Sequence, residues 1–448
     1  MRTTFHLKTL AVAIATLSVA SMTNAAGLDR SGQDVTAFLQ DGTYAEAVYT
    51  YIDADVSGYD SANVNPDEKA YERGNKTGDI AEAYDFFRYG VKTDINDTFS
   101  IGLLYDEPFG AAAEYTQSNF VASNNPQASG GELVTDGVDA TTAGGIALAE
   151  STTAGENTNV EVRSQSLTGI LGMKFGANKN FQVYGGPVAQ RIQSETKLRG
   201  LAYGPATGYT SNSNPDMDYG YIAGIAYSKP EIALKAALTY RSEIDHSIEI
   251  SETYPIRGVR GLGSNAATAP IALINSLSTQ VSNYEITTPK SVNFDFQTGI
   301  NPTTLATAKV RWVPWSDFVI TPPLYNATSK LNPLYQDDGL NLVEYEDDQW
   351  QVELGLAKRV APALAISGTV GWDSGAGDPT TSLGPVDGYY SVGLGAKYNV
   401  TENWAVSAGG KYLWFGDAQG ALPTDKIVAD FEDNDGFIAG VKISYQAR

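Results

Sequence analysis

Hydrophobic and polar residues alternate with a period of two in segments spread along the whole chain. In the segment WQVELGLA, Trp350, Val352, Leu354 and Leu356 fall on one face, and small or polar residues fall on the other. Residues two apart share one face of a β-strand, so this pattern predicts strands with one apolar face. The pattern recurs in YGYIAGIAY, LAISGTVGW, WAVSAGGKYLW and FIAGVKISY, where aromatic residues stand near the ends of the apolar face.

The connections between these segments are alternately short and long. Turns such as GANKN and NPTT contrast with long polar segments at about residues 116–157 and 247–287. Short periplasmic turns and long extracellular loops are typical of outer-membrane barrels. We therefore predict an all-β fold, a transmembrane antiparallel β-barrel of about 14 strands, with a secreted β-sandwich or solenoid as the alternative. The predicted strands are 43–54, 79–93, 98–115, 158–175, 180–196, 218–228, 231–246, 289–301, 304–315, 345–357, 363–373, 387–398, 403–415 and 435–446.

The N-terminus has the features of a secretory signal peptide. Arg2 and Lys8 precede an apolar run, LAVAIATLSVA, and the small residues Thr23 and Ala25 follow it. This order predicts cleavage after Ala25. An exported barrel belongs in the bacterial outer membrane, so residues 1–25 are the predicted signal peptide and residues 43–448 the predicted transmembrane barrel.

Residues 26–42 lie between the signal peptide and the first strand. They are too few and too polar to form a domain, and they start at the periplasmic end of the barrel. Val35, Phe38 and Leu39 are the apolar residues that a hatch or plug would tuck into the lumen. A disordered tail is the alternative.

The composition excludes several kinds of site. The chain has 448 residues, no cysteine and a formal net charge of -22, so disulfides, thiol chemistry and nucleic-acid binding are not expected. His246 is the one histidine beyond the signal peptide, which excludes histidine-rich metal sites, and neither a metal nor a cofactor is expected. A lipolytic enzyme would need His246 with Ser242 or Ser247. Residues 53–60, DADVSGYD, do not have the spacing of an EF-hand calcium loop.

Cationic residues are predicted to face the lumen. Where Ala308 and Val310 face lipid, Lys309 and Arg311 face inward, and on the strand 231–246 the same alternation turns Arg241 inward. The facing of Arg191 depends on how Pro187 affects the register. These cations pair with luminal Glu353, Asp295 and Asp373, or one or two of them bind an anionic head group through charge-assisted hydrogen bonds.

Two further segments stand out. In YDEPFGAAAEY, residues 105–115, Pro108 and Gly110 interrupt a strand, where each weakens the hydrogen-bonded ladder. In TAPIALINSLSTQV, Ile271, Ile274 and Leu277 recur at helical spacing after a proline, which predicts an apolar helix in an extracellular loop.

Several motifs together resemble the FadL family of outer-membrane long-chain fatty acid transporters. They are AGLDRSGQ, EPFGAAAEY, ALTYRSEIDHSIEI, TPKSVNFDFQTGI and VRWVPWSDF, of which LTYRSE is the most specific. The resemblance implies a fourteen-stranded barrel with an N-terminal hatch and passive uptake of hydrophobic molecules. Extracellular loops capture the ligand, an inner apolar pocket with basic residues binds it, and it leaves sideways beside a kinked third strand.

Carried onto this chain, the resemblance places the kink at Pro108, Phe109 and Gly110. The helix around residues 271–281 forms part of the capture groove, and Arg191 is the basic residue near the ligand carboxylate. Two features depart from the family pattern: the hatch lacks the Asn-Pro-Ala motif, and the chain ends in ISYQAR rather than on an aromatic residue.

The predicted function is passive transport of long-chain fatty acids or other hydrophobic molecules. A general diffusion porin and an aromatic-hydrocarbon channel are the alternatives. The expected partners are the hydrophobic ligand, outer-membrane lipid and lipopolysaccharide, and the barrel assembly machinery, with the chain acting as a monomer.

Overall fold

The computed structural model describes residues 28–63, 68–117, 120, 140–262, 265 and 269–447. The predicted signal peptide, residues 1–25, lies outside these residues. None of the helices within the described ranges is long and apolar enough to span a membrane.

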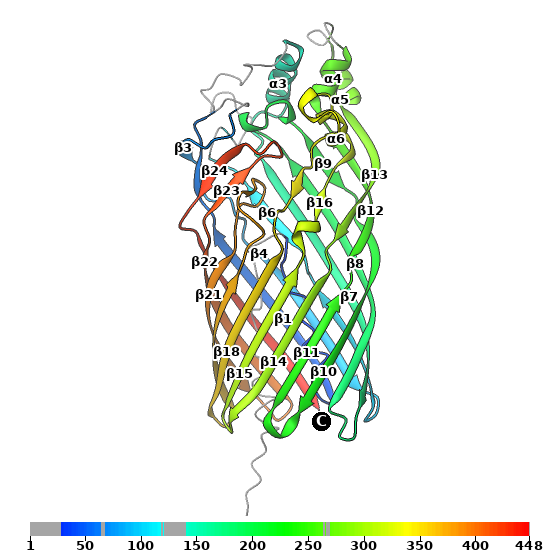
Figure 1. The fold of residues 1–448 in the computed structure, drawn as a ribbon, viewed down its shortest axis with the longest axis vertical. Coiled ribbons are helices and arrows are strands. Elements are labelled where there is room, and N and C mark those ends of the chain that lie inside the picture. Colours follow the sequence, from blue (N-terminus) through cyan, green and yellow to red (C-terminus); the bar gives the residue numbers. More distant parts are fainter. Residues whose placement is uncertain are drawn as a thin grey trace, which may run out of the picture.

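One antiparallel sheet closes on itself to form a barrel (Figure 1). The last strand pairs with the first along its whole length, from Thr43 opposite Ala447 to Asp55 opposite Asp435. Four wall strands consist of two pieces each, so eighteen pieces form fourteen strands. In order they are β1 (Thr43–Asp55), β4 (Tyr84–Asp94), β5 (Phe99–Asp106) with β6 (Gly110–Glu114), β7 (Asn159–Phe175), β8 (Phe181–Lys197), β9 (Thr210–Ser213) with β10 (Asp216–Lys229), β11 (Leu234–Arg241) with β12 (Ile244–Thr253), β13 (Thr279–Thr288) with β14 (Ser291–Asn301), β15 (Thr304–Val313), β18 (Gln349–Ala361), β19 (Leu364–Asp373), β21 (Tyr389–Asn399), β22 (Trp404–Phe415) and β25 (Asp435–Ala447).

The predicted barrel is confirmed. The predicted strand bounds differ from the observed ones at several strand ends. The second strand begins at Tyr84 rather than at residue 79, and the third is split after Asp106. The seventh and eighth strands extend well beyond their predicted outer ends, as β12 and β13. In β12 the alternation with a period of two continues, but the exposed face is polar, with Asp245, Ser247 and Glu249 outward. A rule that requires an apolar outer face predicts a loop there.

Extracellular loops fold over one end of the barrel, at the top of Figure 1. The helix predicted near residue 271 is present as α5 (Ile271–Ser278). The other helices there are α3 (Ala140–Thr152), α4 (Pro255–Leu262) and α6 (Pro323–Ser329), with short 3-10 helices η1 (Leu201–Ala206), η4 (Trp315–Asp317) and η5 (Pro333–Tyr335). Two small sheets complete the loops: β2 (Gly58–Ser61), β3 (Arg73–Lys76), β20 (Thr380–Thr381), β23 (Ala418–Ala421) and β24 (Ile427–Phe431), and β16 (Val319–Ile320) with β17 (Val343–Glu344). At the other end, η2 (Pro230–Ile232) forms a turn.

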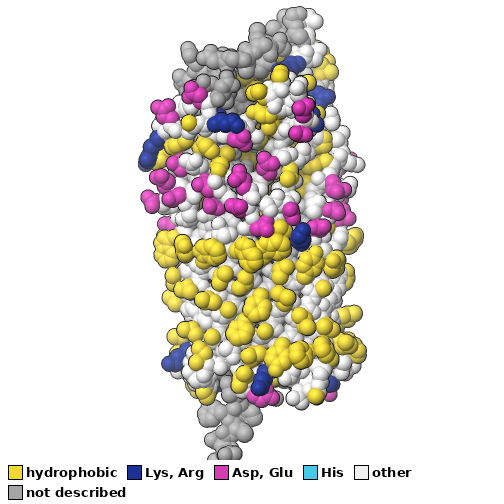
Figure 2. All heavy atoms as spheres, in the orientation of Figure 1, with side chains coloured by type: hydrophobic (Ala, Val, Ile, Leu, Met, Phe, Trp, Pro, Cys, Tyr) yellow, Lys and Arg dark blue, Asp and Glu magenta, His cyan; other side chains and the backbone are white. Residues whose placement is uncertain are grey.

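The barrel wall is apolar outside and polar inside. On the face drawn in Figure 2, hydrophobic side chains are spread over the lower half of the barrel, and most acidic side chains lie above them. On β21, Leu394 is 75% exposed, whereas Lys397 is buried and faces inward. Lys411 and Lys442 are likewise buried inside. This inversion is typical of outer-membrane barrels, whose exposed apolar face lies against lipid tails.

The position of Leu394 tests where the lipid lies. It stands midway between Tyr390 and Tyr398, near the two ends of β21. We expect Leu394→Arg to lower the free energy of unfolding by about 2–4 kcal/mol, because a cation at the bilayer midplane loses its hydration. Urea unfolding in phospholipid vesicles, followed by tryptophan fluorescence, measures this change.

Leu334 provides the matched control. It is 76% exposed, like Leu394, but lies in the extracellular η5. Leu334→Arg should therefore leave the unfolding curve almost unchanged. Equal effects of the two substitutions would contradict the placement of β21 in lipid.

Candidate functional site

Strand three is interrupted where the sequence places Pro108 and Gly110. Its lower piece, β5, pairs with β4 and β7 on its two sides. Its upper piece, β6, pairs with β7 from Gly110 opposite Arg163 to Glu114 opposite Asn159. The ladder between strands two and three ends at Tyr89 opposite Tyr105. Above that point no strand pairing between β4 and β6 occurs among the described residues. Backbone contact between strands two and three resumes only before β4, at the bridge between Ala81 and Ala113 and at the bond from the Glu114 amide to the Ile80 carbonyl, 2.9 Å long. Between these points the wall lacks its regular backbone hydrogen bonds.

The backbone of this kink is satisfied by the N-terminal segment, residues 28–42. The Arg30 amide donates to the carbonyl of Pro108 at 2.8 Å, and the Gly110 amide donates to the carbonyl of Leu28 at 2.8 Å. The Phe109 amide donates to Ser164 Oγ on β7 at 2.7 Å. Buried backbone groups require partners, and here the inward bend of strand three finds them inside the barrel.

A single arginine occupies the space beside the kink. The Arg30 guanidinium carbon lies 4.0 Å from the centre of the Tyr84 ring on strand two. On the other side, a Cβ atom at Gly110 would lie 2.3 Å from the same carbon. Arg30 is buried and therefore packs between strand two and β6, where the wall has no backbone ladder. Glycine at position 110 is what leaves room for it.

The N-terminal segment carries carboxylates that pair with luminal cations. Asp29 accepts hydrogen bonds from Arg311 Nε at 2.6 Å and from Arg311 Nη2 at 2.9 Å. The two side chains form a bidentate ion pair, and both are buried. Asp34 accepts from Lys309 at 3.0 Å and lies 3.7 Å from Arg88. The two carboxylates of the segment thus compensate part of the charge of three wall cations. Glu46 and Asp295 of the wall lie 3.9 Å from Arg88 and Lys309 and supply further negative charge.

Asp34 remains ionised in this setting. Burial alone would raise the pKa of its carboxyl, but the charges of Lys309 and Arg88 and hydrogen bonds from Thr36 hold that pKa below its usual value. A carboxylate that stays charged when buried needs such partners. The segment is therefore held in the lumen by charge as well as by packing.

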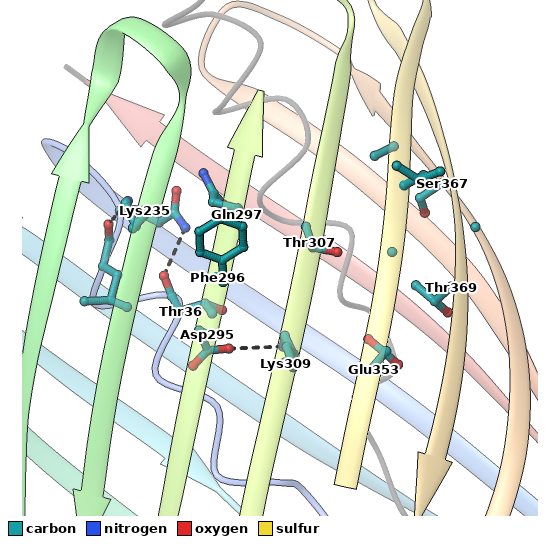
Figure 3. A pocket seen from close by; sticks show the side chains of 16 residues that line it. Thr36, Lys235, Asp295, Phe296, Gln297, Thr307, Lys309, Glu353, Ser367 and Thr369 are labelled. Carbon is teal, nitrogen blue, oxygen red and sulfur yellow. Dashed lines mark hydrogen bonds and ion pairs between the residues drawn. The ribbon is translucent and has the colours of Figure 1, made fainter. Parts of the chain in front are cut away.

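Below these pairs the segment is apolar and packs against luminal side chains of the wall, including Leu104 and Ile170. Val35, Phe38 and Leu39 are all buried, and the rings of Phe38 and Tyr184 are centred 5.6 Å apart. The remaining cavity here is small, about 80 Å³. Figure 3 shows it between the segment and the wall, with Asp295 and Lys309 pointing toward each other from neighbouring strands.

A second cavity, of about 40 Å³, lies on the extracellular side of the kink. Leu28 of the segment and Ala111 of β6 line it, together with Val160 and Val162 of β7. The inward-folded loops supply its other walls, including Leu342, Tyr345 and Leu383. We call this space the outer cavity. It is mainly apolar and adjoins the interrupted strand.

Three of the predicted luminal cations face inward, and one of the expected pairs, Lys309 with Asp295, is present. Arg241 and Arg311 are buried, and Lys309 is largely so. Of the predicted carboxylates, Asp295 lies 3.9 Å from Lys309, whereas Glu353 pairs with Lys411 and Asp373 accepts from Gln349. The N-terminal segment supplies the closer partners.

Arg191 lies on the other face of the wall. The register of β8 is the same on both sides of Pro187, with Thr168 opposite Val188 and Leu171 opposite Gly185. Arg191 is therefore exposed while the adjacent Gln190 is buried, so its side chain does not face the lumen.

In α5, which begins at Ile271, Ile274 is buried and Leu277 is 45% exposed. The Ile274 side chain faces the protein interior, and the backbone carbonyl of Ile274 lies close to Gly258 of α4. Leu277 remains available at the surface of the loop.

Sequence reasoning missed the residues that close the kink. Asp29, Arg30 and Asp34 lie in AGLDRSGQDV, where the family resemblance and the apolar residues gave no role to the charged ones. Charged residues in a segment predicted to enter a cation-lined lumen were the signal that could have found them.

A protein-family model matches residues 35–445, which is most of the chain. It describes outer-membrane transport proteins of the OMPP1/FadL/TodX group. The chain belongs to this family. Its members are transport channels for hydrophobic compounds in the bacterial outer membrane rather than enzymes. No curated protein matches the chain significantly by sequence.

Solved structures share the fold at low sequence identity. A FadL homologue of Pseudomonas aeruginosa is 14% identical, with a TM-score of 0.64 over 98% of this chain and 97% of that one. The toluene transporter TodX of Pseudomonas putida is 10% identical, with a TM-score of 0.53 over 96% and 97%. The toluene transporter TbuX of Ralstonia pickettii is 12% identical, with a TM-score of 0.51 over 94% and 95%.

The pair between Asp29 and Arg311 yields a prediction. Asp29→Asn keeps the shape of the side chain but leaves a buried guanidinium without its counter-charge, so the free energy of unfolding should fall by about 3 kcal/mol. Urea unfolding in vesicles measures it.

Asp425→Asn is the matched control, because Asp425 pairs with Lys69 where both side chains are mostly exposed. Exposed pairs contribute little to stability. An Asp29→Asn curve that coincides with the control would show that the segment does not depend on this ion pair.

Proposed function

We propose that this chain carries long-chain fatty acids or similar hydrophobic molecules through the outer cavity and releases them sideways at the interrupted third strand. The observation that supports this path most strongly is the position of the outer cavity. The cavity borders Ala111 of β6 and Leu28, whose carbonyl holds Gly110. An apolar space therefore adjoins the one place where strand three lacks a ladder to strand two.

The driving force for such a path is partition. Each buried methylene contributes about 0.8 kcal/mol, so a ligand leaving through the wall gains this energy directly in the bilayer. Release downward would instead return the ligand to water. The N-terminal segment acts in this proposal as a plug, since its apolar residues Val35, Phe38 and Leu39 fill the lumen below the kink.

The outer cavity must widen during transport. Its volume of about 40 Å³ is far below the roughly 300–1,000 Å³ of ordinary ligand pockets. The structure thus corresponds to a closed state, in which Arg30 packs across the opening beside Gly110. Displacement of Arg30 would join the cavity to the gap in the wall.

Arg241 is the luminal cation best suited to an anionic head group. Its Nη1 donates to Thr168 at 3.1 Å, and its buried Nε has no hydrogen-bond partner among the described residues. Lys309 and Arg311, by contrast, already pair with Asp34 and Asp29. A fatty acid carboxylate would bind Arg241, whereas an aromatic hydrocarbon, as carried by the toluene transporters above, would leave it unused.

The kink itself is tested by a double variant. Pro108→Ala with Gly110→Val should lower uptake of labelled oleate several-fold at equal surface level. An amide at position 108 and a β-branched residue at position 110 favour a regular ladder across the kink, and the valine side chain would fill the space that Arg30 now occupies. Toluene uptake by the same variant shows whether the opening serves both ligand classes.

Gly169→Val on the adjacent β7 is the control, since a Cβ there meets only Pro187 at 3.9 Å. Folding of all variants is checked by electrophoresis, because a folded barrel migrates differently before and after heating. If oleate and toluene both enter the double variant as fast as the control, the sideways path is wrong.

A further inference from the structure

The barrel wall has a second seam, between strands six and seven. Their backbone ladder runs up to Ile222 opposite Arg241 and resumes only at Ser213 opposite Ile250. Between these points the structure gives one backbone bond at each end, from Ser242 to Tyr221 and from Asn214 to Glu249. Within the described residues, the middle of the seam lacks the regular ladder that joins most other neighbouring strands of the wall.

Three potential metal ligands meet at this seam. Asp216 and Asp218 come from β10 and His246 from β12, and their ligand atoms lie within 4.8 Å of one another. Asp218 Oδ2 accepts from the backbone amide of Ser247 at 3.4 Å, which already ties the two strands together through a side chain. The cluster therefore spans the seam rather than lying on one strand.

The hydrogen bonds of His246 leave one ring nitrogen without a partner. Gln190 Oε1 accepts from the Thr288 hydroxyl at 2.7 Å and lies 3.0 Å from His246 Nε2. An amide oxygen only accepts, so the ring proton sits on Nε2 and Nδ1 carries a lone pair. The side chain is 0% exposed, and Nδ1 has no hydrogen-bond partner among the described residues.

That lone pair faces a second acceptor. Asp216 Oδ2 lies 3.5 Å from His246 Nδ1 and is also a buried atom with no hydrogen-bond partner in the described part of the chain. Two acceptors facing each other are unfavourable unless a cation lies between them. In a tetrahedral zinc site, ligand atoms about 2.0–2.1 Å from the metal stand roughly 3.3 Å apart, close to the observed separation.

We propose that Asp216, Asp218 and His246 bind a divalent transition-metal ion, with Zn²⁺ as the best fit, and that the ion clamps strands six and seven. An imidazole with two carboxylates suits Zn²⁺ and its neighbours rather than Ca²⁺ or Mg²⁺, which take oxygen ligands. Gln190 orients the imidazole through Nε2, as the outer partner of a metal-bound histidine does. The fourth position is left for water.

The test uses the full-length mature barrel, folded in detergent, freed of any affinity tag and stripped with chelator. Zn²⁺ is added with millimolar Ca²⁺ and Mg²⁺ present, so that the many exposed acidic groups of this strongly acidic chain are saturated. We expect one Zn²⁺ per chain by elemental analysis. Co²⁺ in its place should give the visible absorption of a tetrahedral site.

His246→Gln and Asp216→Asn should each weaken Zn²⁺ binding by at least tenfold and abolish the Co²⁺ spectrum. Asp245→Asn is the matched control: Asp245 is adjacent to His246 but exposed on the opposite face, where it accepts from Thr287. Zn²⁺ should also raise the temperature at which the folded barrel unfolds and its electrophoretic mobility changes. This rise is expected for the wild-type chain and for Asp245→Asn, but not for the other two variants.

Two outcomes would overturn the proposal. One is a wild-type chain that retains no stoichiometric Zn²⁺ and gives no tetrahedral Co²⁺ spectrum, which would mean that a proton occupies the space between His246 and Asp216. The other is equal binding by all variants, which would place the ion elsewhere.

Discussion

The structure depends on ion pairs between the N-terminal segment and the cations inside the barrel. Arg311 and Arg88 are buried inside the barrel and Lys309 is largely so, and an uncompensated buried charge is costly. Asp29 and Asp34 supply the compensation from a separate part of the chain. The same pairs position the segment, so its backbone reaches the kink of strand three and its apolar end packs against the inner wall below.

This arrangement explains how a closed barrel tolerates a broken strand. A sheet in lipid cannot leave backbone groups unpaired. At the kink, the amide of Arg30 and the carbonyl of Leu28 replace the missing neighbours, and the Arg30 side chain fills the space beside Gly110. The seal is made of a few side chains and hydrogen bonds rather than a ladder. Such a seal can open at far lower cost than a wall of paired strands.

The barrel was predictable from sequence because its wall repeats one local rule, apolar residues outward and small or polar residues inward. The strand predicted at residues 158–175 differs from β7 by one residue at its start. The break at Pro108 and Gly110 was also visible, since both residues act locally. The residues that close the break were not predictable from sequence, because the Asp29–Arg311 pair joins residues 282 apart in the chain. Periodicity reports which way a side chain faces, but not which distant group meets it.

The sideways path requires the plug to stay in place while substrate passes, and a cross-link tests this directly. A Cβ atom at Gly90 on strand two would lie 2.8 Å from Ala37 Cβ, near enough for a disulfide after a shift of about 1 Å. The chain has no other cysteine. With Ala37→Cys and Gly90→Cys, we expect oleate uptake to be the same before and after reduction. Uptake that is blocked in the oxidised protein and returns on reduction would show that the segment must leave the lumen, which contradicts release through the wall.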